Sequence, residues 1–153
     1  MKRKRLIISA FSILIFVLPN YALAYNMISN GGFEEGFSYW NQWSSVSTQL
    51  VTDPVVENNY AAYLEGINGI WQYHTYGEGD YTVSAWLQVL EGAAKIGIST
   101  RTGQGIDSQK IGPTGEWQYL ELTRKDFSGI GGPYIYADAS LGTPSKFYAD
   151  SIW

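Results

Sequence analysis

The chain contains no cysteine among its 153 residues. A disulfide framework, a thiolate metal site and a lipid-modified cysteine are therefore excluded. It has a single histidine, His74, and no serine in a glycine-flanked elbow, so a nucleophile with its base is not recognisable in the sequence. Stability must come from packing, with a bound metal as the one further source.

Basic residues are scarce beyond the first few positions. Four of them occupy positions 2–5 and precede an apolar run at 6–18, which is followed by Ala22-Leu23-Ala24. This order is typical of a secretory signal peptide, and the run is shorter than the roughly 20 residues that cross a bilayer. We expect residues 1–24 to be removed and the protein to be secreted, either extracellular or periplasmic; an uncleaved anchor is the alternative.

Removal of this segment makes the protein strongly acidic. The ten Lys and Arg fall to six against fourteen Asp and Glu, so the net charge changes from −4 to −8. Such a surface repels phosphate backbones and anionic lipids. We therefore expect no nucleic-acid partner and no membrane partner, and favour a neutral ligand or a cation.

No stretch has a sustained helical period, and short β-rich runs are separated by Gly, Pro, Asn and Asp. The clearest strand is 81–90, in which one alternate set of residues is predicted to face the core: Tyr81, Val83, Ala85, Leu87 and Val89. Residues 94–100 are its expected hairpin partner, after a turn near 91–92.

The remaining strands complete an all-β chain. They are expected at 26–29, 37–44, 49–52, 61–65, 70–75, 117–124, 134–138 and 146–153, with an exposed loop at 103–111. About nine or ten strands suit two packed antiparallel sheets. The predicted fold is a two-sheet antiparallel β-sandwich of jelly-roll type, and residues 25–153 form its single domain.

Aromatic residues are abundant, with six Trp and twelve Tyr. Alternation places Trp86, between Ser84 and Gln88, on the strand face opposite the core. On a late strand it places Tyr134, Tyr136 and Asp138 opposite the inward Ile135 and Ala137, as a second half of the same site.

Other aromatic positions are harder to assign, and Trp43, Tyr60 and Tyr63 stay unassigned. In the run 70–74, either Trp71 and Tyr73 or Gln72 and His74 face outward, and alternation does not decide between them. Trp40 and Trp117 stand at strand starts and are expected in the core.

Four segments together resemble a known family. They are Asn30-Gly31-Gly32-Phe33-Glu34 with Trp40 following, 79–86, Glu116-Trp117 and 147–152. Their order and spacing are similar to those of the jelly-roll carbohydrate-binding modules appended to secreted xylanases and cellulases, which have a galactose-binding-domain-like fold. The resemblance implies a sugar-binding surface on a concave sheet and a structural calcium near the joined termini.

The resemblance places this calcium on the backbone carbonyl of Gly32 and the carboxylates of Glu34 and Asp150, with one further ligand from 50–60. Oxygen ligands suit calcium, and the ends of a domain often lie close together. Where the family often has two adjacent acids, this chain has Asp150-Ser151. The alternative is that 30–32 is only a tight turn and both acids are solvated.

The predicted function is non-catalytic binding of a polysaccharide or oligosaccharide by aromatic stacking. The expected ligand-binding residues are Trp71, Gln72, Trp86, Gln88, Tyr134, Tyr136 and Asp138. A separate glycan-degrading enzyme or a cell-surface protein is a candidate partner. Two alternatives stay open: a secreted structural or adhesive domain, and a small glycan hydrolase or lyase using acids such as Glu65, Glu78, Glu121 or Asp138.

Overall fold

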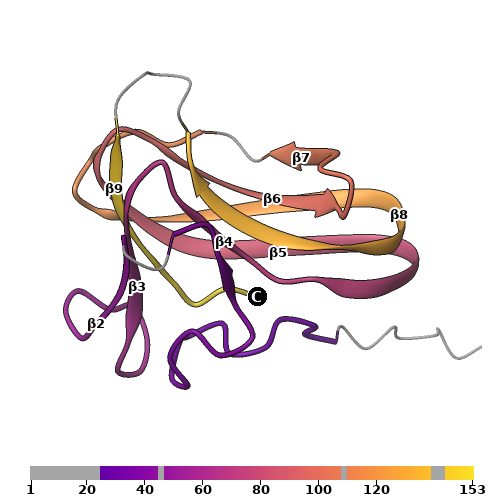
Figure 1. Ribbon diagram of the computed structural model, residues 1–153, viewed down its shortest axis with the longest axis horizontal. Helices are drawn as coiled ribbons and strands as arrows, with labels where there is room; N and C mark the ends of the chain where they lie inside the picture. Colours follow the sequence, from indigo (N-terminus) through magenta and orange to yellow (C-terminus); the bar gives the residue numbers. More distant parts are fainter. Residues whose placement is uncertain (1–24, 45–46, 108–109, 139–143) are drawn as a thin grey trace, which may run out of the picture.

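The fold is described from a computed structural model (Figure 1), which defines residues 25–44, 47–107, 110–138 and 144–153. The expected signal peptide, 1–24, lies outside these residues. Within them the structure is all-β, and no helix is long and apolar enough to cross a membrane.

Most strands overlap the ranges predicted from the sequence. They are β1 (Asn41–Gln42), β2 (Thr48–Val51), β3 (Ala61–Gly66), β4 (Gly69–Trp71), β5 (His74–Glu91), β6 (Ala94–Thr100), β7 (Gly105–Asp107), β8 (Trp117–Ala137) and β9 (Ser145–Asp150).

Two long strands, β5 and β8, connect the two layers of a β-sandwich (Figure 1). The first layer has the order β2-β3-β9-β5-β8, and here residues 117–124 of β8 pair with 81–88 of β5. The second layer contains β1, β4, β6 and β7 around the later part of β8, whose residues 131–137 pair with β6. All these pairings are antiparallel, as expected for a jelly roll.

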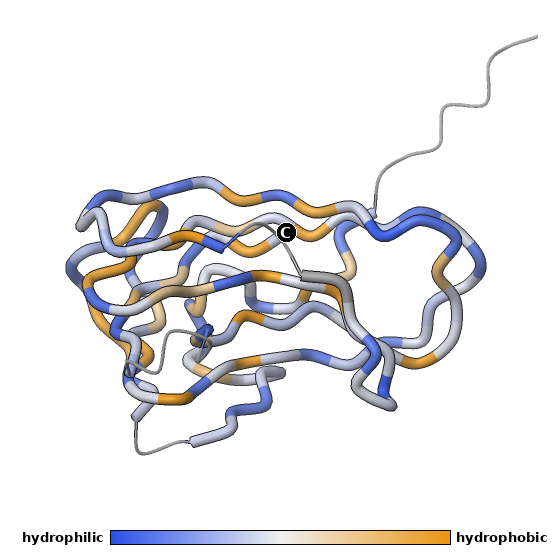
Figure 2. The backbone as a smooth tube through the Cα atoms, turned by 90° about the horizontal axis from the view of Figure 1, so that it is seen from above, coloured by the Kyte–Doolittle hydropathy of each residue, from blue (hydrophilic) through white to orange (hydrophobic). Residues whose placement is uncertain are grey.

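The core lies between the layers. Val83, Leu87 and Val89 of β5 face Ile96 and other apolar residues of the second layer, and all are buried. Figure 2 shows hydrophobic residues alternating with polar ones along the strands. Because successive strand residues point to opposite faces, the residues between these core positions face outward. The predicted core face of β5 is thus confirmed.

Some expected pairings and boundaries are wrong. Strand β6 pairs with β7 and β8 instead of forming a hairpin with β5, because the chain crosses to the other layer after Gly92, which has a φ of 70°. Strand β7 lies in the expected loop 103–111, residues 26–29 form no strand, and the expected strands 117–124 and 134–138 are parts of one strand, β8.

Candidate functional site

A hollow lined by aromatic rings opens on the outer face of the second layer. Its volume is about 350 Å³. Its rings come from β4, from β8 and from the segments that follow β1 and β4. We call these five residues the aromatic hollow: Trp43, Trp71, Tyr73, Tyr134 and Tyr136.

The rings of the aromatic hollow form one connected surface. The Trp43 centroid lies 5.6 Å from that of Trp71 and 5.9 Å from that of Tyr136. Tyr134 and Tyr136 are 5.3 Å apart, and Trp71 and Tyr73 are 6.4 Å apart. Trp43 is 57% exposed and Tyr73 48% exposed, so large ring surfaces remain open to solvent.

Two glycines make room for these rings. A Cβ on Gly69 would lie 2.6 Å from the six-membered ring of Trp43 and 2.8 Å from the Ile135 carbonyl oxygen. A Cβ on Gly105 would lie 2.8 Å from the Tyr134 hydroxyl. The rings therefore pack directly on backbone, which only glycine permits at such distances.

Polar groups in the hollow are neutral. Ser99 and Thr100 contribute hydroxyls, and none of the described residues that line it carries a charge. Ring faces and hydroxyls together suit an uncharged ligand with apolar faces and hydroxyl rims.

One wall of the hollow is held by Arg124 from the bend of β8. Its Nη1 donates to the carbonyls of Ile98 at 2.9 Å and Gln104 at 3.2 Å. Since Gly103 and Gly105 flank Gln104 in that wall, the guanidinium fixes the loop between β6 and β7 against the sheet.

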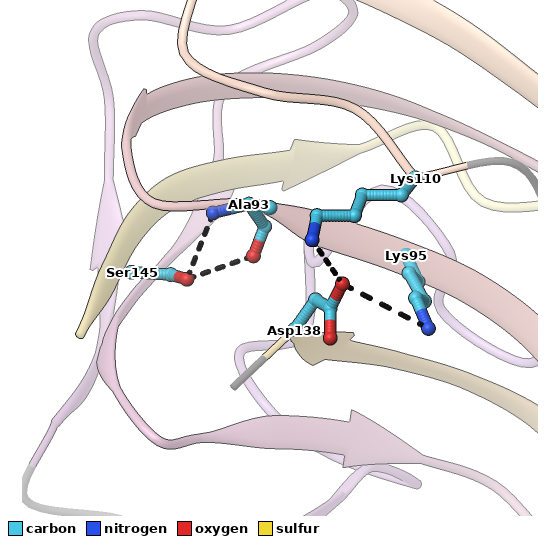
Figure 3. A network of polar contacts seen from close by, with 5 residues as sticks. All are labelled: Ala93, Lys95, Lys110, Asp138 and Ser145. Carbon is cyan, nitrogen blue, oxygen red and sulfur yellow. Dashed lines mark hydrogen bonds and ion pairs between the residues drawn. The ribbon is translucent and has the colours of Figure 1, made fainter. Parts of the chain in front are cut away.

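A buried carboxylate forms ion pairs with two partly exposed lysines close to the hollow, and Figure 3 shows these three residues. Asp138 is 4% exposed, and its Oδ2 lies 2.8 Å from Lys110 Nζ and 3.9 Å from Lys95 Nζ. Lys95 Nζ in turn lies 5.7 Å from the Tyr136 ring centroid. Asp138 is therefore beside the hollow. We expected its carboxylate to bind the ligand, but it pairs with two lysines and does not line the hollow.

The structure brings together three of the predicted ligand-binding residues, Trp71, Tyr134 and Tyr136. It also settles the run 70–74: Trp71 and Tyr73 line the hollow, and the intervening Gln72 does not. Trp43 was left unassigned by the sequence. The only sequence feature that relates to its position is Gly69. The Trp43 ring can lie on the sheet because residue 69 has no Cβ in its way.

The prediction for Gln72 is wrong. This residue is 2% exposed, and its amide bonds the backbone of Ser29 twice, accepting from the N–H at 3.1 Å and donating to the carbonyl at 2.6 Å. Its Oε1 also lies 3.1 Å from His74 Nε2, and burial lowers the pKa of His74. Gln72 therefore anchors the N-terminal segment and is not available to a ligand.

The prediction that Trp86 and Gln88 share a site with the tyrosines is also wrong. They alternate with core residues of β5 in the first layer, whereas Tyr134 and Tyr136 alternate with core residues of β8 in the second. The two groups thus face outward on opposite sides of the sandwich. Trp117 pairs with Gln88 on that same outer face and is half-buried, so it is not a core residue, whereas Trp40 is buried as expected.

The two predicted metal carboxylates contact the same loop. Glu34 accepts hydrogen bonds from the N–H of Asn59 at 2.9 Å and of Tyr60 at 3.1 Å, and from Asn59 Nδ2 at 2.8 Å. Asp150 Oδ2 accepts from the N–H groups of Val56 at 2.7 Å and Glu57 at 3.1 Å. Both ends of the domain are therefore tied to residues 56–60.

These hydrogen bonds and burial act differently on the two acids. The side-chain amide and backbone of Asn59 lower the pKa of exposed Glu34. Burial raises the pKa of Asp150, against the opposing effect of its N–H donors. Over the described ranges, no group of three or more His, Cys, Asp or Glu side chains could hold a metal. A cation here would depend on backbone carbonyls such as that of Gly32.

Comparison with known proteins identifies the fold. The sequence matches no protein-family model and no curated protein. Among solved structures, it is similar to the module TmCBM61 in complex with β-1,4-galactotriose, with a TM-score of 0.68 and 20% identity over 85% of this chain and 97% of that one. A family 16 carbohydrate-binding module gives 0.60 and 19% over 84% and 98%.

A third similar structure is the Clostridium thermocellum endo-1,4-β-D-xylanase 10B with its CBM22-1 and GH10 modules, complexed with xylohexaose. The TM-score is 0.58 at 17% identity, over 80% of this chain and 27% of that one. The resemblance recognised in the sequence is thus confirmed at the level of structure. The chain has the jelly-roll β-sandwich fold of carbohydrate-binding modules.

Proposed function

We propose that this protein is a secreted, non-catalytic carbohydrate-binding module that binds a neutral polysaccharide or oligosaccharide in the aromatic hollow. The observation that carries the proposal is the connected, partly exposed ring surface with an uncharged rim. Pyranose rings have apolar C–H faces that stack on Trp and Tyr, and their hydroxyls bond neutral donors and acceptors. The similar structures with galactotriose and xylohexaose support the same class of ligand.

The lining of the hollow supports binding without catalysis. Hydrolysis of a glycosidic bond uses two carboxyl groups separated by about 5 to 9.5 Å. None of the described residues that line the hollow is acidic. Asp138, the nearest predicted acid, is occupied by two lysines. A glycan-degrading enzyme would then be a separate protein that benefits from the bound substrate.

The direct test is affinity electrophoresis on xylan, glucan, mannan and galactan gels, comparing the wild type with Trp43→Ala and Trp43→Phe. Loss of one stacking ring should weaken binding by about tenfold, while phenylalanine keeps much of the ring surface. Because Trp43 is largely exposed, the melting temperature should change little in either variant. Equal retardation of all three proteins would contradict the proposed site, and no retardation by any polymer would favour an adhesive role.

The proposal includes a structural calcium held by Gly32, Glu34 and Asp150. The donor set fits a hard cation, which prefers oxygen ligands. Glu34 Oε2 and Asp150 Oδ1 each accept only one of the hydrogen bonds described, so each carboxylate retains acceptor capacity. A bound calcium would supply positive charge beside Asp150 and join the two ends of the domain.

Calcium is tested by thermal melting with and without a chelator. Binding to the folded state alone raises stability by mass action, so chelation should lower the melting temperature. Calorimetric titration with calcium should show one site in the wild type and none in Glu34→Ala. Identical melting curves with and without chelator, and no heat of binding on titration with calcium, would show that the protein has no calcium site.

A further inference from the structure

We propose a second glycan-binding surface on the outer face of the first layer, distinct from the aromatic hollow. It rests on the proposed function, because it takes the same class of ligand: a neutral polysaccharide chain. We call it the Trp86 face. Its residues are Tyr63, Trp86, Gln88, Trp117, Tyr119 and Tyr148.

Strand register sets these residues in adjacent rows. Tyr63 of β3 pairs with Tyr148 of β9, which pairs with Gln88 of β5, which pairs with Trp117 of β8. The next row contains the pair Trp86 and Tyr119. The rows thus cross four neighbouring strands, and cross-strand partners lie on one face of a sheet.

Ring contacts join the aromatic residues of the Trp86 face into two groups, which the strand register sets in adjacent rows. The centroids are 5.2 Å apart for Tyr63 and Tyr148, 6.4 Å for Trp117 and Tyr148, and 5.5 Å for Trp86 and Tyr119. Tyr119 is 50% exposed, and the other rings are half-buried. The rings therefore present a broad surface on which sugar rings can stack.

Hydrogen-bonding groups stand among these rings. Gln88 Oε1 is buried and has no partner in the ranges that the structure describes, although the Gln88 amide nitrogen donates to the Gly115 carbonyl. The hydroxyl of Tyr119 donates to Glu121 at 2.8 Å, and that of Tyr63 donates to Glu65 at 3.2 Å. The carboxylates of Glu65 and Glu121 keep spare lone pairs that match the hydroxyl donors of a sugar, and Gln88 Oε1 would join them after a change of its rotamer.

The charges around the face select its occupant. Glu65, Glu91 and Glu121 border the rings, and Lys146 pairs with the first two at 4.0 and 3.0 Å. The border therefore remains negative and disfavours uronic-acid and phosphate polymers. It also disfavours a second copy of this chain, because a two-fold dimer would place the same carboxylates against each other. A neutral glycan carries no charge that these carboxylates would repel.

The opposite orientation of the two surfaces has a functional consequence. The Trp86 face and the aromatic hollow lie on opposite outer faces of the sandwich, so one molecule could engage two chain segments at once. Two linked sites raise the overall affinity for a polymer without any new contact. A short oligosaccharide gains nothing from this linkage, because it occupies one site at a time.

The experiment uses Trp43→Ala for the hollow, Tyr119→Ala for the Trp86 face, and the double variant, with Tyr119→Phe as the matched control. Retardation is measured on xylan, glucan, mannan and galactan gels. Calorimetric stoichiometry is measured with xylohexaose and β-1,4-galactotriose. We expect Tyr119→Ala to weaken retardation by at least threefold with an unchanged melting temperature, and the double variant to weaken it more than either single variant. Calorimetry should show two sites in the wild type, with one of the two weakened in each single alanine variant.

Each failure has its own pattern. If Trp43→Ala alone abolishes retardation and Tyr119→Ala behaves as the wild type, the Trp86 face is refuted and the proposed function stands. If Trp43→Ala is retarded as strongly as the wild type and Tyr119→Ala abolishes retardation, the aromatic hollow is refuted as a binding site. A Tyr119-dependent dimer in sedimentation, without retardation by any polymer, would overturn the glycan assignment of the face.

Discussion

The carbonyl oxygen of Gly31 accepts a hydrogen bond of 3.1 Å from the N–H of Ile152, which joins the two ends of the domain. The approach is so close that a Cβ on Gly31 would lie 2.0 Å from the Ile152 carbonyl oxygen. Gly31→Ala must therefore move backbone. We expect it to lower the free energy of unfolding by about 3 kcal/mol and the melting temperature by about 10 °C, measured by thermal denaturation.

Gly32→Ala is the matched control for this prediction. A Cβ on Gly32 would lie 3.5 Å from Asn58 Nδ2, an ordinary contact. Measured in chelator, so that no proposed metal site contributes, the same chemical change one residue further along should alter the free energy of unfolding by less than about 1 kcal/mol. Equal losses in both variants would show that the close approach to Ile152 is not the cause.

The strand pattern could be predicted because alternation reports which residues a strand buries. In β5, Val83 and Leu87 are buried as their spacing requires, and the sandwich follows from such strands. Which strands pair could not be predicted, because β5 and β6 alternate alike whether they share a sheet or face each other across the core. The turn at Gly92 makes a hairpin plausible from sequence, whereas the packed structure uses it to change layers.

Replacing Gln72 tests whether this buried amide is structural. Gln72→Ala removes both hydrogen bonds to Ser29 and leaves a small cavity, so it should cost about 2 to 3 kcal/mol of folding free energy, read from denaturant titration. Gln118→Ala removes an exposed amide with one side-chain bond and should cost less than about 0.5 kcal/mol. Polysaccharide retardation well below the melting temperature should be unchanged in both. A Gln72→Ala protein that is stable but no longer binds would restore Gln72 to the ligand site.

The two carboxylates at the domain ends should differ in their effect on stability. Asp150→Ala leaves the N–H groups of Val56 and Glu57 without their acceptor in a partly buried loop, and should cost about 3 kcal/mol. Glu34→Ala exposes its donors to water and should produce a smaller drop in melting temperature. Both measurements are made in chelator, so that only hydrogen bonds are compared. The reverse order would contradict this assignment.

The candidate site was only partly predictable for a similar geometric reason. Alternation shows that Trp86 and Tyr136 both leave the core, but it does not show on which side of the sandwich each emerges. That depends on the layer to which each strand belongs, which is a non-local property. Trp43 lies in no strand, so its position depends on the bare backbone at Gly69 and not on any period.

The single histidine gives a pH signature of its own. Burial lowers the pKa of His74 below 6.5, so the unfolded chain binds this proton more tightly than the folded chain does. Stability from the neutral imidazole is complete above about pH 6.5 and is lost as the pH falls below that value. We expect the wild-type melting temperature to fall more between pH 7 and pH 5.5 than that of His74→Phe, which keeps an aromatic ring packed near Tyr76.

Both proteins carry the same carboxylates, so the difference between their changes in melting temperature with pH isolates the effect of the imidazole. NMR titration of the ring protons of His74 measures its pKa directly. A ring that titrates at or above 6.5, or equal slopes in the two proteins, would show that the imidazole is solvated in the folded state.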